Sequence, residues 1–436
     1  MGIIRNEAHH DSVYGIVATQ AGPQLGRRGT NNCMLSVADA TQRVLLECRP
    51  LPPCRTPLAS ALGRRLAEDI ASDCNMPPFD KAMMDGYAVR AADVPGELLV
   101  VEEITAGRSP TRCVESGQAA RIMTGAPLPA GADAVVMIER TEMLSGGNRV
   151  RITVAAKTGQ HIAARASDLR LGERVLSAEQ LLGPAEIGLL ATVGRDEALV
   201  TPSCDVAVLS TGDELVEPGT PPSPVQIRNS NGPMLTAQVA TTGARGQYLG
   251  IARDNPEQLR ERIQAGLNAR VLVLSGGVSA GKLDLVPGIL TSLGVEPRFH
   301  KVAMKPGKPV FFGVRPGSPS PTLVFGLPGN PVSAFVAFEL FVRPAIRALR
   351  GEPSPAPEFE SLPLAGDFEY ATDRPTYHPA TIGPGGVRPV EWRGSPDLRA
   401  LTLADAMCLL PAGDFRHRAG DSVPTYSWCR VWSVHS

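Results

Sequence analysis

Three loops of small residues carry the residue types from which an anion-binding site could be built. The segments 210–214 (STGDE), 275–281 (SGGVSAG) and 326–333 (GLPGNPVS) each follow a short apolar run. Small residues let backbone N–H groups approach an anion, and a helix that begins after such a loop adds a partial positive charge. None of these loops matches the Walker or the dinucleotide-binding pattern. The loops therefore predict an uncommon type of phosphate site, with ordinary tight turns as the simpler alternative.

Two lysines lie close together in the segment 305–309, which reads KPGKP. The prolines stiffen this segment and so lower the entropic cost of presenting Lys305 and Lys308 to one anion. We expect an oxyanion to bind here. A solvated basic turn is the alternative, because exposed lysines are common.

Carboxylates lie in or beside the small-residue loops, namely Asp213, Glu214 and Asp284. Carboxylates near a phosphate are best explained by a shared Mg²⁺, which takes one or two of them and keeps several waters. The alternative for Asp213 or Glu214 is that it caps the next element.

Two upstream segments also mix polar residues with turn-forming and apolar ones. They are 79–89 (FDKAMMDGYAV) and 121–127 (RIMTGAP). Asp85 and Thr124 are the reactive side chains within them. A local explanation stays open, because Asp-Gly is an ordinary turn dipeptide and a threonine can satisfy its own loop backbone.

Alternating strands and helices position the three loops. Unbroken apolar runs at 206–209, 271–274 and 323–325 are typical of strands that are buried on both faces. A fourth, shorter strand is expected at 248–251. Helices are expected near 233–242, from 256 to about 267, and from 331 to about 349, where Asn330 suits the N-cap and Pro331 the first turn. The pattern predicts a central doubly wound, mostly parallel α/β sheet that binds ligands beyond the carboxyl ends of its strands.

The rest of the chain divides around this sheet. Ser36 begins a predicted helix with a capping-box variant, and the β-rich stretch from 98 to 154 resembles a small lid. After the Pro-rich link 352–357, short alternating segments predict a small C-terminal β-barrel or sandwich. The predicted parts are a polar, disordered leader (1–32), a discontinuous N-terminal region (33–203) with a β-rich lid (about 95–168), an α/β domain (204–350) and a C-terminal β domain (355–433).

Composition restricts the function classes. The 436 residues suggest roughly three domains at about 150 residues each. A formal net charge of −1 provides no basic field for a nucleic-acid backbone. The eight cysteines are scattered without zinc-ligand spacing, so reduced thiols are expected. Because no apolar run reaches the roughly 20 residues of a membrane helix and no signal peptide is recognisable, we expect a cytoplasmic protein without a membrane partner.

The loop, lysine and carboxylate motifs described above resemble those of the molybdopterin molybdenumtransferases, the molybdenum-insertion enzymes related to the C-terminal part of gephyrin. The resemblance covers roughly residues 36–431 and rests on six motifs in family order: PPFDKAMMDGYAVR, RIMTGAPLPAGADAVV, VAVLSTGDELVEPG with QIRNSN, SGGVSAGKLD, KPGKPVFFG and GLPGNPVSAF. It implies insertion of molybdenum from molybdate into adenylylated molybdopterin, with loss of AMP and a requirement for Mg²⁺. It also implies a homodimer in which the lid of one subunit closes the site of the other.

The resemblance assigns roles to numbered positions. The catalytic candidates are Asp85, Thr124, Asp168, Glu214 and Asp284, of which Glu214 and Asp284 are the expected Mg²⁺ ligands. The candidates on the substrate and molybdate motifs are Lys305, Lys308, Pro309 and Ser333, with Arg374 and Ser395 as two further oxyanion ligands. The substrate-binding candidates in the small-residue loops are Ser210, Thr211, Gly212, Ser275, Gly276, Gly277, Ser279, Pro328, Gly329 and Asn330.

Four positions depart from the family pattern. Where the family usually has Arg-x-x-Gly-Glu-Asp, this chain has Ala166 and Ser167 before Asp168, so the lid segment loses a glycine and a carboxylate. Asn229 occupies a position often held by Asp, and Leu285 stands where an aromatic residue is common. An asparagine can coordinate a metal through its carbonyl but adds no charge, so a lower Mg²⁺ affinity is expected.

Two other functions compete with this interpretation. Adenylyl transfer to molybdopterin is one, because the central domain resembles that of the adenylylating enzymes; the DGYAV and RIMTGAP segments argue against it. A non-catalytic scaffold that binds molybdopterin or a peptide is the other, since gephyrin reuses the fold to anchor a receptor peptide. The retained lysines and acidic loops disfavour a scaffold.

Overall fold

A computed structural model describes residues 34–278, 285–317 and 320–428. The chain divides into a first unit, Met1–Met34, and a second unit, Leu35–Ser436, and everything below concerns the second. The predicted leader at 1–32 lies outside the described residues. Within the described ranges, no helix combines the length and the apolar character that crossing a membrane requires.

The centre of the second unit is a six-stranded sheet in the order β17-β14-β18-β21-β20-β19. The first four strands are parallel, and β20 and β19 are antiparallel to their neighbours. The mostly parallel sheet was expected, but the antiparallel edge was not. The strands are β17 (Arg245–Ala252), β14 (Asp205–Thr211), β18 (Val271–Ser275), β21 (Thr322–Leu327), β20 (Phe311–Arg315) and β19 (Glu296–Phe299).

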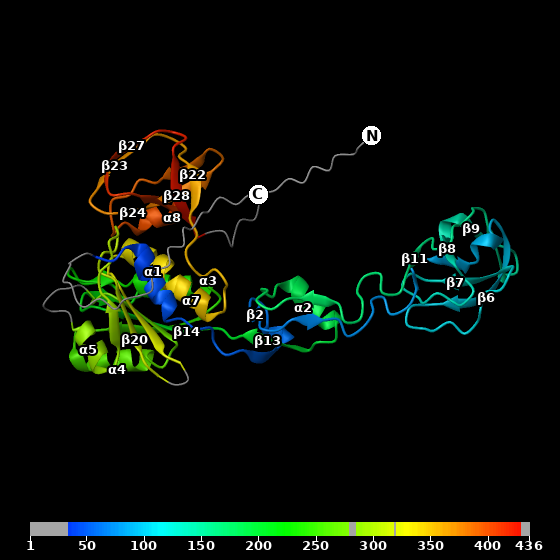
Figure 1. Ribbon diagram of the computed structural model, residues 1–436, viewed down its shortest axis with the longest axis horizontal. Coiled ribbons are helices and arrows are strands. Elements are labelled where there is room, and N and C mark those ends of the chain that lie inside the picture. The colour runs from blue at the N-terminus through cyan, green and yellow to red at the C-terminus, as the bar shows by residue number, and fades with distance from the viewer. Residues whose placement is uncertain (1–33, 279–284, 318–319, 429–436) are drawn as a thin grey trace, which may run out of the picture. The chain divides into compact units, whose positions relative to one another are not determined.

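Helices cover both faces of this sheet, as a doubly wound fold requires. Alternate side chains of each strand enter separate cores because successive strand residues point to opposite faces. Val206 and Val208 pack with residues of α1, α3, α6 and α7, whereas Ala207 and Leu209 pack with residues of α4 and α5, and Figure 1 shows the two groups on opposite sides. The helices are α1 (Val37–Leu46), α3 (Asn231–Thr241), α4 (Pro256–Gly266), α5 (Val286–Ser292), α6 (Pro331–Ala337) and α7 (Arg343–Leu349).

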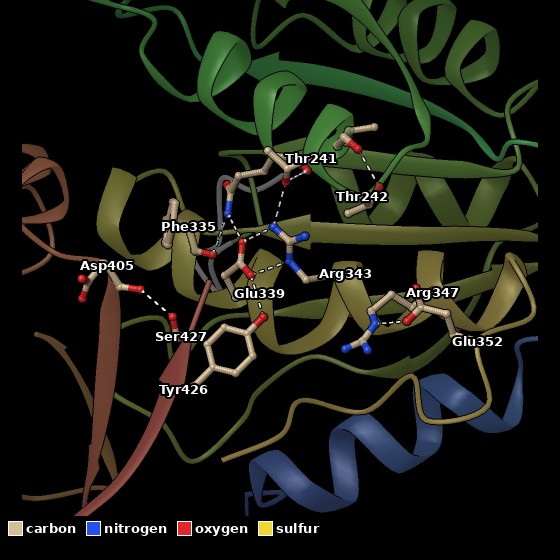
Figure 2. Close-up of polar contacts among 12 residues, drawn as sticks. Thr241, Thr242, Phe335, Glu339, Arg343, Arg347, Glu352, Asp405, Tyr426 and Ser427 are labelled. Carbon is tan, nitrogen blue, oxygen red and sulfur yellow. Dashed lines mark hydrogen bonds and ion pairs between the residues drawn. The ribbon is translucent and has the colours of Figure 1, made fainter. Parts of the chain in front are cut away.

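The helix expected from 331 to about 349 contains a change of hydrogen-bonding pattern. A π-helical segment, Phe338–Val342, separates α6 from α7. It places Glu339 at the centre of a buried polar cluster, in which Glu339 accepts hydrogen bonds from Gln238 Nε2 (2.7 Å), Tyr426 Oη (2.9 Å) and the guanidinium of Arg343 (2.5 and 2.9 Å), as Figure 2 shows for the labelled partners. A buried carboxylate is tolerated when it is paired and fully hydrogen-bonded. The cluster ties α3 and the π-helical segment to the C-terminal strand that carries Tyr426.

The N-terminal region is built largely from short strands. A three-stranded sheet in the order β1-β13-β2 packs with α2 (Pro184–Thr192). A separate six-stranded sheet has the order β8-β5-β7-β6-β10-β9. All of its strands except β5 fall within 95–168, the range predicted for the lid. The strands are β1 (Cys54–Pro57), β13 (Glu197–Thr201), β2 (Arg65–Leu66), β8 (Ala134–Met137), β5 (Gly86–Val89), β7 (Gln118–Ile122), β6 (Gly96–Ile104), β10 (Arg149–Ile152) and β9 (Thr141–Met143).

Several small elements complete the N-terminal and central regions. They are the strand pairs β11 (Ile162–Ala163) with β4 (Lys81–Ala82), β12 (Arg174–Leu176) with β3 (Ile70–Ala71), and β15 (Leu215–Val216) with β16 (Ile227–Arg228), and the 3₁₀ turns Leu58–Ser60, Ala91–Asp93 and Ile138–Arg140. The pair β15-β16 lies between the end of β14 and the start of α3 in the chain.

The C-terminal part is also β-rich, as predicted. A five-stranded antiparallel sheet has the order β22-β28-β26-β24-β25, and a bridge between Leu364 and Val387 joins the segments at its two outer strands. The barrel remains a prediction, as does the lid. The elements are β22 (Glu360–Pro363), β28 (Ser422–Ser427), β26 (Ala406–Leu410), β24 (Thr376–Gly383), β25 (Gly386–Pro389), the pair β23 (Phe368–Thr372) with β27 (Gly413–His417), and α8 (Leu398–Thr402).

Candidate active site

A cavity of about 600 Å³ opens where the parallel strands of the central sheet end. The register explains its position, because Ser210 of β14 pairs with Ser275 of β18, which in turn pairs with Leu327 of β21. The strands therefore end at the same level, and the three small-residue loops meet there, as parallel-sheet topology predicts. The sequence-predicted residues that line it are Thr211, Gly212, Glu214, Ser275, Gly276, Gly277, Pro309, Pro328, Gly329 and Asn330.

Two glycines shape the wall of this first cavity. Gly276 has a φ of +89°, and a Cβ there would lie 2.5 Å from the carbonyl oxygen of Thr211. Gly277 has a φ of +62°, and a Cβ there would lie 2.7 Å from Thr211 Oγ1. Both the left-handed backbone and the close approach to β14 require glycine. The small residues noticed in the sequence are therefore needed for the loop conformation itself.

Carboxylates form one rim of the first cavity. Glu214 and Asp254 line it, and the backbone N–H of Asp254 donates to Asp213 Oδ1 (3.1 Å). Partial burial, together with the charges of Asp213 and Glu214, raises the pKa of the Asp254 carboxyl. A divalent cation would lower this repulsion.

The donor set fits Mg²⁺ better than a closed metal cage. No group of three or more metal-ligating side chains that could hold an ion occurs among the described residues. Mg²⁺ does not need such a group, since it is usually bound by one or two carboxylates together with waters and substrate phosphates. Glu214 is placed to be one of those carboxylates. Asp284, the other predicted ligand, lies outside the described residues, as does Ser279.

A second cavity of about 600 Å³ adjoins the first. It brings together predicted residues that are far apart in the sequence: Lys305, Lys308, Pro309, Ser333, Arg374 and Ser395. The two cavities share Pro309, Pro328 and Asn330 in their walls. The second cavity thus presents cationic and hydroxyl groups next to a cavity with glycine loops and an acidic rim.

Main-chain bonds hold the C-terminal part against the lysine segment. Lys305 N–H donates to the carbonyl of Pro375 (2.9 Å), and Tyr377 N–H donates to the carbonyl of Lys305 (2.7 Å). Asn330 Nδ2 donates to Ser395 Oγ (2.8 Å). These bonds explain how Arg374 and Ser395 come to line a cavity whose lysines belong to the central domain.

Four predicted residues do not line either cavity. The Asp85 carboxylate accepts hydrogen bonds from Thr124 N–H (2.7 Å) and Oγ1 (2.8 Å), and these bonds lower its pKa. Asp168 lines a separate hollow formed by residues 166–173 and accepts a bond from Ser167 Oγ (2.9 Å). Ser210 is fully buried, and its hydroxyl donates to Asn229, so it supports the first cavity from behind.

Comparison with known proteins identifies the family. Residues 35–194 match the model of the MoeA N-terminal region (domain I and II), and residues 207–348 match that of the probable molybdopterin binding domain. A protein named molybdopterin molybdenumtransferase 2 from Mycobacterium tuberculosis is 41% identical over 333 residues, covering 72% of this chain and 80% of its own. The chain belongs to the molybdopterin molybdenumtransferase family. A family protein from Staphylococcus aureus is 33% identical over 404 residues, 89% of this chain and 94% of its own.

Solved structures agree with this assignment to the molybdopterin molybdenumtransferases. A crystal structure of the molybdopterin biosynthesis moea protein from Pyrococcus horikosii superposes with a TM-score of 0.75 at 32% identity. The match covers 91% of this chain and 99% of that one. The multidomain α/β fold is therefore that of the family.

The structure shows what two departures from the molybdopterin molybdenumtransferase pattern do locally. Ala166, where the family usually has Gly, has a φ of +62° and so keeps a conformation that disfavours a side chain. Asn229 Oδ1 accepts from Ser210 Oγ (3.2 Å) and Gly232 N–H (3.1 Å), and its Nδ2 donates to Tyr248 Oη (2.6 Å). A metal at this carbonyl would therefore have to displace one of the two bonds that it accepts, and the lower Mg²⁺ affinity stays a prediction.

Several residues that line the first cavity were given no role by sequence reasoning, and two of them matter most. Asp254 directly precedes Asn255, the residue that caps α4, and had no motif to mark it. Asn231 was quoted within a family motif but was given no role; it lies in the first turn of α3 and lines the cavity. The only available signal was an unusual density of asparagine in the segment 228–231, RNSN.

Proposed function

We propose that this protein inserts molybdenum from molybdate into adenylylated molybdopterin and releases AMP. The observation that carries the proposal is the pair of adjoining cavities with different chemistry, which share Pro309, Pro328 and Asn330. The names of its relatives support the same reaction. An organic phosphoester in the first cavity and a tetrahedral oxyanion in the second would lie next to each other, which is the arrangement that a transfer reaction needs.

The oxyanion half of the proposal rests on charge. Lys305, Lys308 and Arg374 supply positive charge, and Ser333 and Ser395 supply hydroxyl donors. Molybdate is a dianion that accepts hydrogen bonds from all of these groups, and charge-assisted bonds of this kind are the strong ones. Adjacent backbone N–H groups of the glycine loops would hold the phosphate of the organic substrate.

We infer that Mg²⁺ is required and that Glu214 is one of its ligands. When bound, Mg²⁺ would neutralise phosphate charge beside the acidic rim. Glu214→Gln is expected to raise the Mg²⁺ concentration for half-maximal activity about tenfold, because one charged ligand is lost. Glu257→Gln, on the exposed first turn of α4, is the matched control and should leave the Mg²⁺ requirement unchanged. Equal effects of the two substitutions would contradict this role.

We further infer that the protein works as a homodimer in which the sheet carrying Asp85 and Thr124 acts as a lid on the partner. The support is that Asp85 and Thr124 line neither cavity of their own chain. Asp85→Asn and Lys308→Ala are each expected to be impaired at a molybdate concentration far below the raised KM of Lys308→Ala. At that concentration, mixing the two variants should restore part of the activity in mixed dimers if the sites are shared between subunits. A failure of such complementation, with mixed dimers demonstrated, would contradict the shared site.

The decisive experiment is a defined reaction. Purified protein is incubated with adenylylated molybdopterin, molybdate and Mg²⁺, and AMP release and molybdenum cofactor are measured together. We expect both products in equal amounts and neither without molybdate. A folded sample that forms no cofactor would refute the proposal, and ATP-dependent adenylylation of molybdopterin by this protein would favour the alternative transferase.

A further inference from the structure

The side-chain amide of Asn231 has only one orientation that its neighbours permit. Its nitrogen lies 2.7 Å from Ser275 Oγ and 2.7 Å from the carbonyl oxygen of Gly329. A carbonyl oxygen can only accept, so the atom that faces Gly329 must be the donor Nδ2. Flipping the amide would place two acceptors against each other. The position of Oδ1 is therefore fixed.

Asn231 Oδ1 is buried and has no hydrogen-bond partner among the described residues. The residue is 7% exposed and lines the first cavity. Buried acceptors are nearly always paired with protein, water or a ligand, so an unpaired acceptor that lines a cavity is a place where a ligand can bring the donor. Asn231 Nδ2 already donates to Ser275 and Gly329. The side chain can therefore form a further hydrogen bond only as an acceptor, through Oδ1.

A second atom of the same cavity has the same property. Thr211 Oγ1 is buried without a partner in the described part of the chain, and the residue is 2% exposed. The space beside it is kept open by Gly276 and Gly277, whose added Cβ atoms would lie 3.2 and 2.7 Å from this oxygen. Asn231 and Thr211 are thus two preformed, unsatisfied polar groups on the wall of one cavity.

The chemistry of the missing partner follows from these atoms. Molybdate and a phosphate ester are acceptors near neutral pH and cannot satisfy Asn231 Oδ1. Among the groups that the substrates carry, only an N–H or O–H donor on the organic part can satisfy this oxygen. We propose that Asn231 Oδ1 accepts an N–H donor from a nitrogen heterocycle of the organic substrate, with Thr211 Oγ1 as an adaptable second contact. The proposal rests on the proposed function for the identity of that substrate and makes Asn231 a residue that determines specificity.

Binding measurements with separate ligands test this role. The affinities of molybdopterin and of 5′-AMP are measured for the wild type and for Asn231→Ala, which shows whether the donor belongs to the pterin or to the adenine. We expect the Kd of the ligand that carries the donor to rise about tenfold, the loss of one neutral hydrogen bond. Thr211→Val, which keeps the shape of the side chain, should give a smaller rise. The affinity for molybdate should be unchanged in both variants.

A control variant separates recognition from structure. Gln238 lies on the same helix and lines neither cavity, and its buried carbonyl oxygen also has no partner in the part of the chain that the structure describes. Gln238→Ala should lower thermal stability without changing either Kd. A pterin methylated at its donor nitrogen extends the test: methylation should weaken binding to the wild type and have little effect on Asn231→Ala, a coupling that a purely structural role of Asn231 would not produce.

The outcomes distinguish this inference from the proposed function. If the wild type forms cofactor and Asn231→Ala binds both ligands as well as the wild type does, the inference is overturned and the proposed function stands. If the wild type forms no cofactor but binds molybdopterin or AMP in a manner that depends on Asn231, the inference stands and the proposed function is overturned. A wild type that binds neither ligand overturns both.

Discussion

The first cavity and the Asp85–Thr124 pair differ in the burial and the hydrogen bonding of their polar groups. In the cavity, Thr211 Oγ1 and Asn231 Oδ1 are buried without a partner among the described residues, within strands and loops packed around them. The Asp85 carboxylate, directly before β5 of the separate six-stranded sheet, is exposed and already accepts two bonds from Thr124. The cavity thus presents polar atoms that a ligand can still bond, whereas Asp85 would have to exchange a partner to take part in a reaction.

The largest effect is expected from breaking the wall of the cavity. Gly276→Ala places a Cβ 2.5 Å from the Thr211 carbonyl oxygen on a left-handed backbone, so it should lower the free energy of unfolding by about 3 kcal/mol. Chemical denaturation followed by circular dichroism measures this change. Gly288→Ala is the control, because a Cβ on that α5 residue would meet no atom of the described residues within 4 Å and alanine favours a helix. Equal losses in the two variants would show that the wall is not rigid.

The second-largest effect is expected from Lys308→Ala, which tests whether the second cavity binds the oxyanion. Lys308→Ala should raise the KM for molybdate about 10- to 100-fold, the loss of one charge-assisted contact, with a smaller change in the KM for the organic substrate. Steady-state kinetics with each substrate varied in turn measure the difference. Lys301→Ala, an exposed lysine that lines neither cavity, should leave both constants unchanged. Parallel changes in both KM values of Lys308→Ala would contradict separate binding regions.

A smaller effect is expected at the exposed pair. The Thr124 N–H, and then its hydroxyl, hold the pKa of Asp85 below the ordinary value of about 3.9. Thr124→Val removes only the hydroxyl, so the Asp85 pKa should rise but stay below that value. Because the folded-state pKa is depressed, this contribution to stability is present above the unfolded pKa and is lost as pH falls through the folded one.

NMR titration of the Asp85 carboxyl carbon measures this shift directly. In Thr124→Val the stabilising contribution should be smaller and should be completely lost at a higher pH than in the wild type. Thr111→Val, which removes a hydroxyl donor from Glu102 elsewhere on the same sheet, is a control that should leave the Asp85 titration unchanged. An unaltered Asp85 titration in Thr124→Val would mean that the backbone N–H alone sets its pKa.

The smallest effect concerns the segment between the two regions in the sequence. Ala166→Gly should stabilise the protein by about 0.5 kcal/mol, because relief of the left-handed alanine slightly exceeds the entropic cost of a glycine. Ala163→Gly in β11 should instead destabilise it, since a strand gains nothing from glycine. Differential scanning calorimetry compares the two. A lower melting temperature for Ala166→Gly would contradict the strain assigned to this position.

The same contrast explains what the sequence could predict. Strands β14, β18 and β21 are buried on both faces, so they appear as unbroken apolar runs, and parallel pairing then brings their loops together. The role of Asn231 could not be found in this way, because its partners Ser275 and Gly329 lie 44 and 98 residues away. The π-helical segment was equally hidden, since apolar spacing does not distinguish it from the α-helix on either side.

The C-terminal part was predicted in outline, but its contribution to the second cavity depended on the family resemblance. Arg374 and Ser395 have no pattern of their own that marks them as anion ligands. Their position follows from the pairing of the Lys305 backbone with the backbone around Thr376, a long-range contact that composition does not encode.

That pairing has a consequence for how the family could diversify. The first cavity is lined almost entirely by the central domain, whereas the second is completed by the stretch from Arg374 to Ser395. On the proposed function, exchanging the C-terminal part between relatives would replace part of the wall of the oxyanion cavity and leave the cavity for the organic substrate nearly unchanged. The preference for molybdate or tungstate would then evolve separately from recognition of the organic substrate, because different segments of the chain form the two cavities.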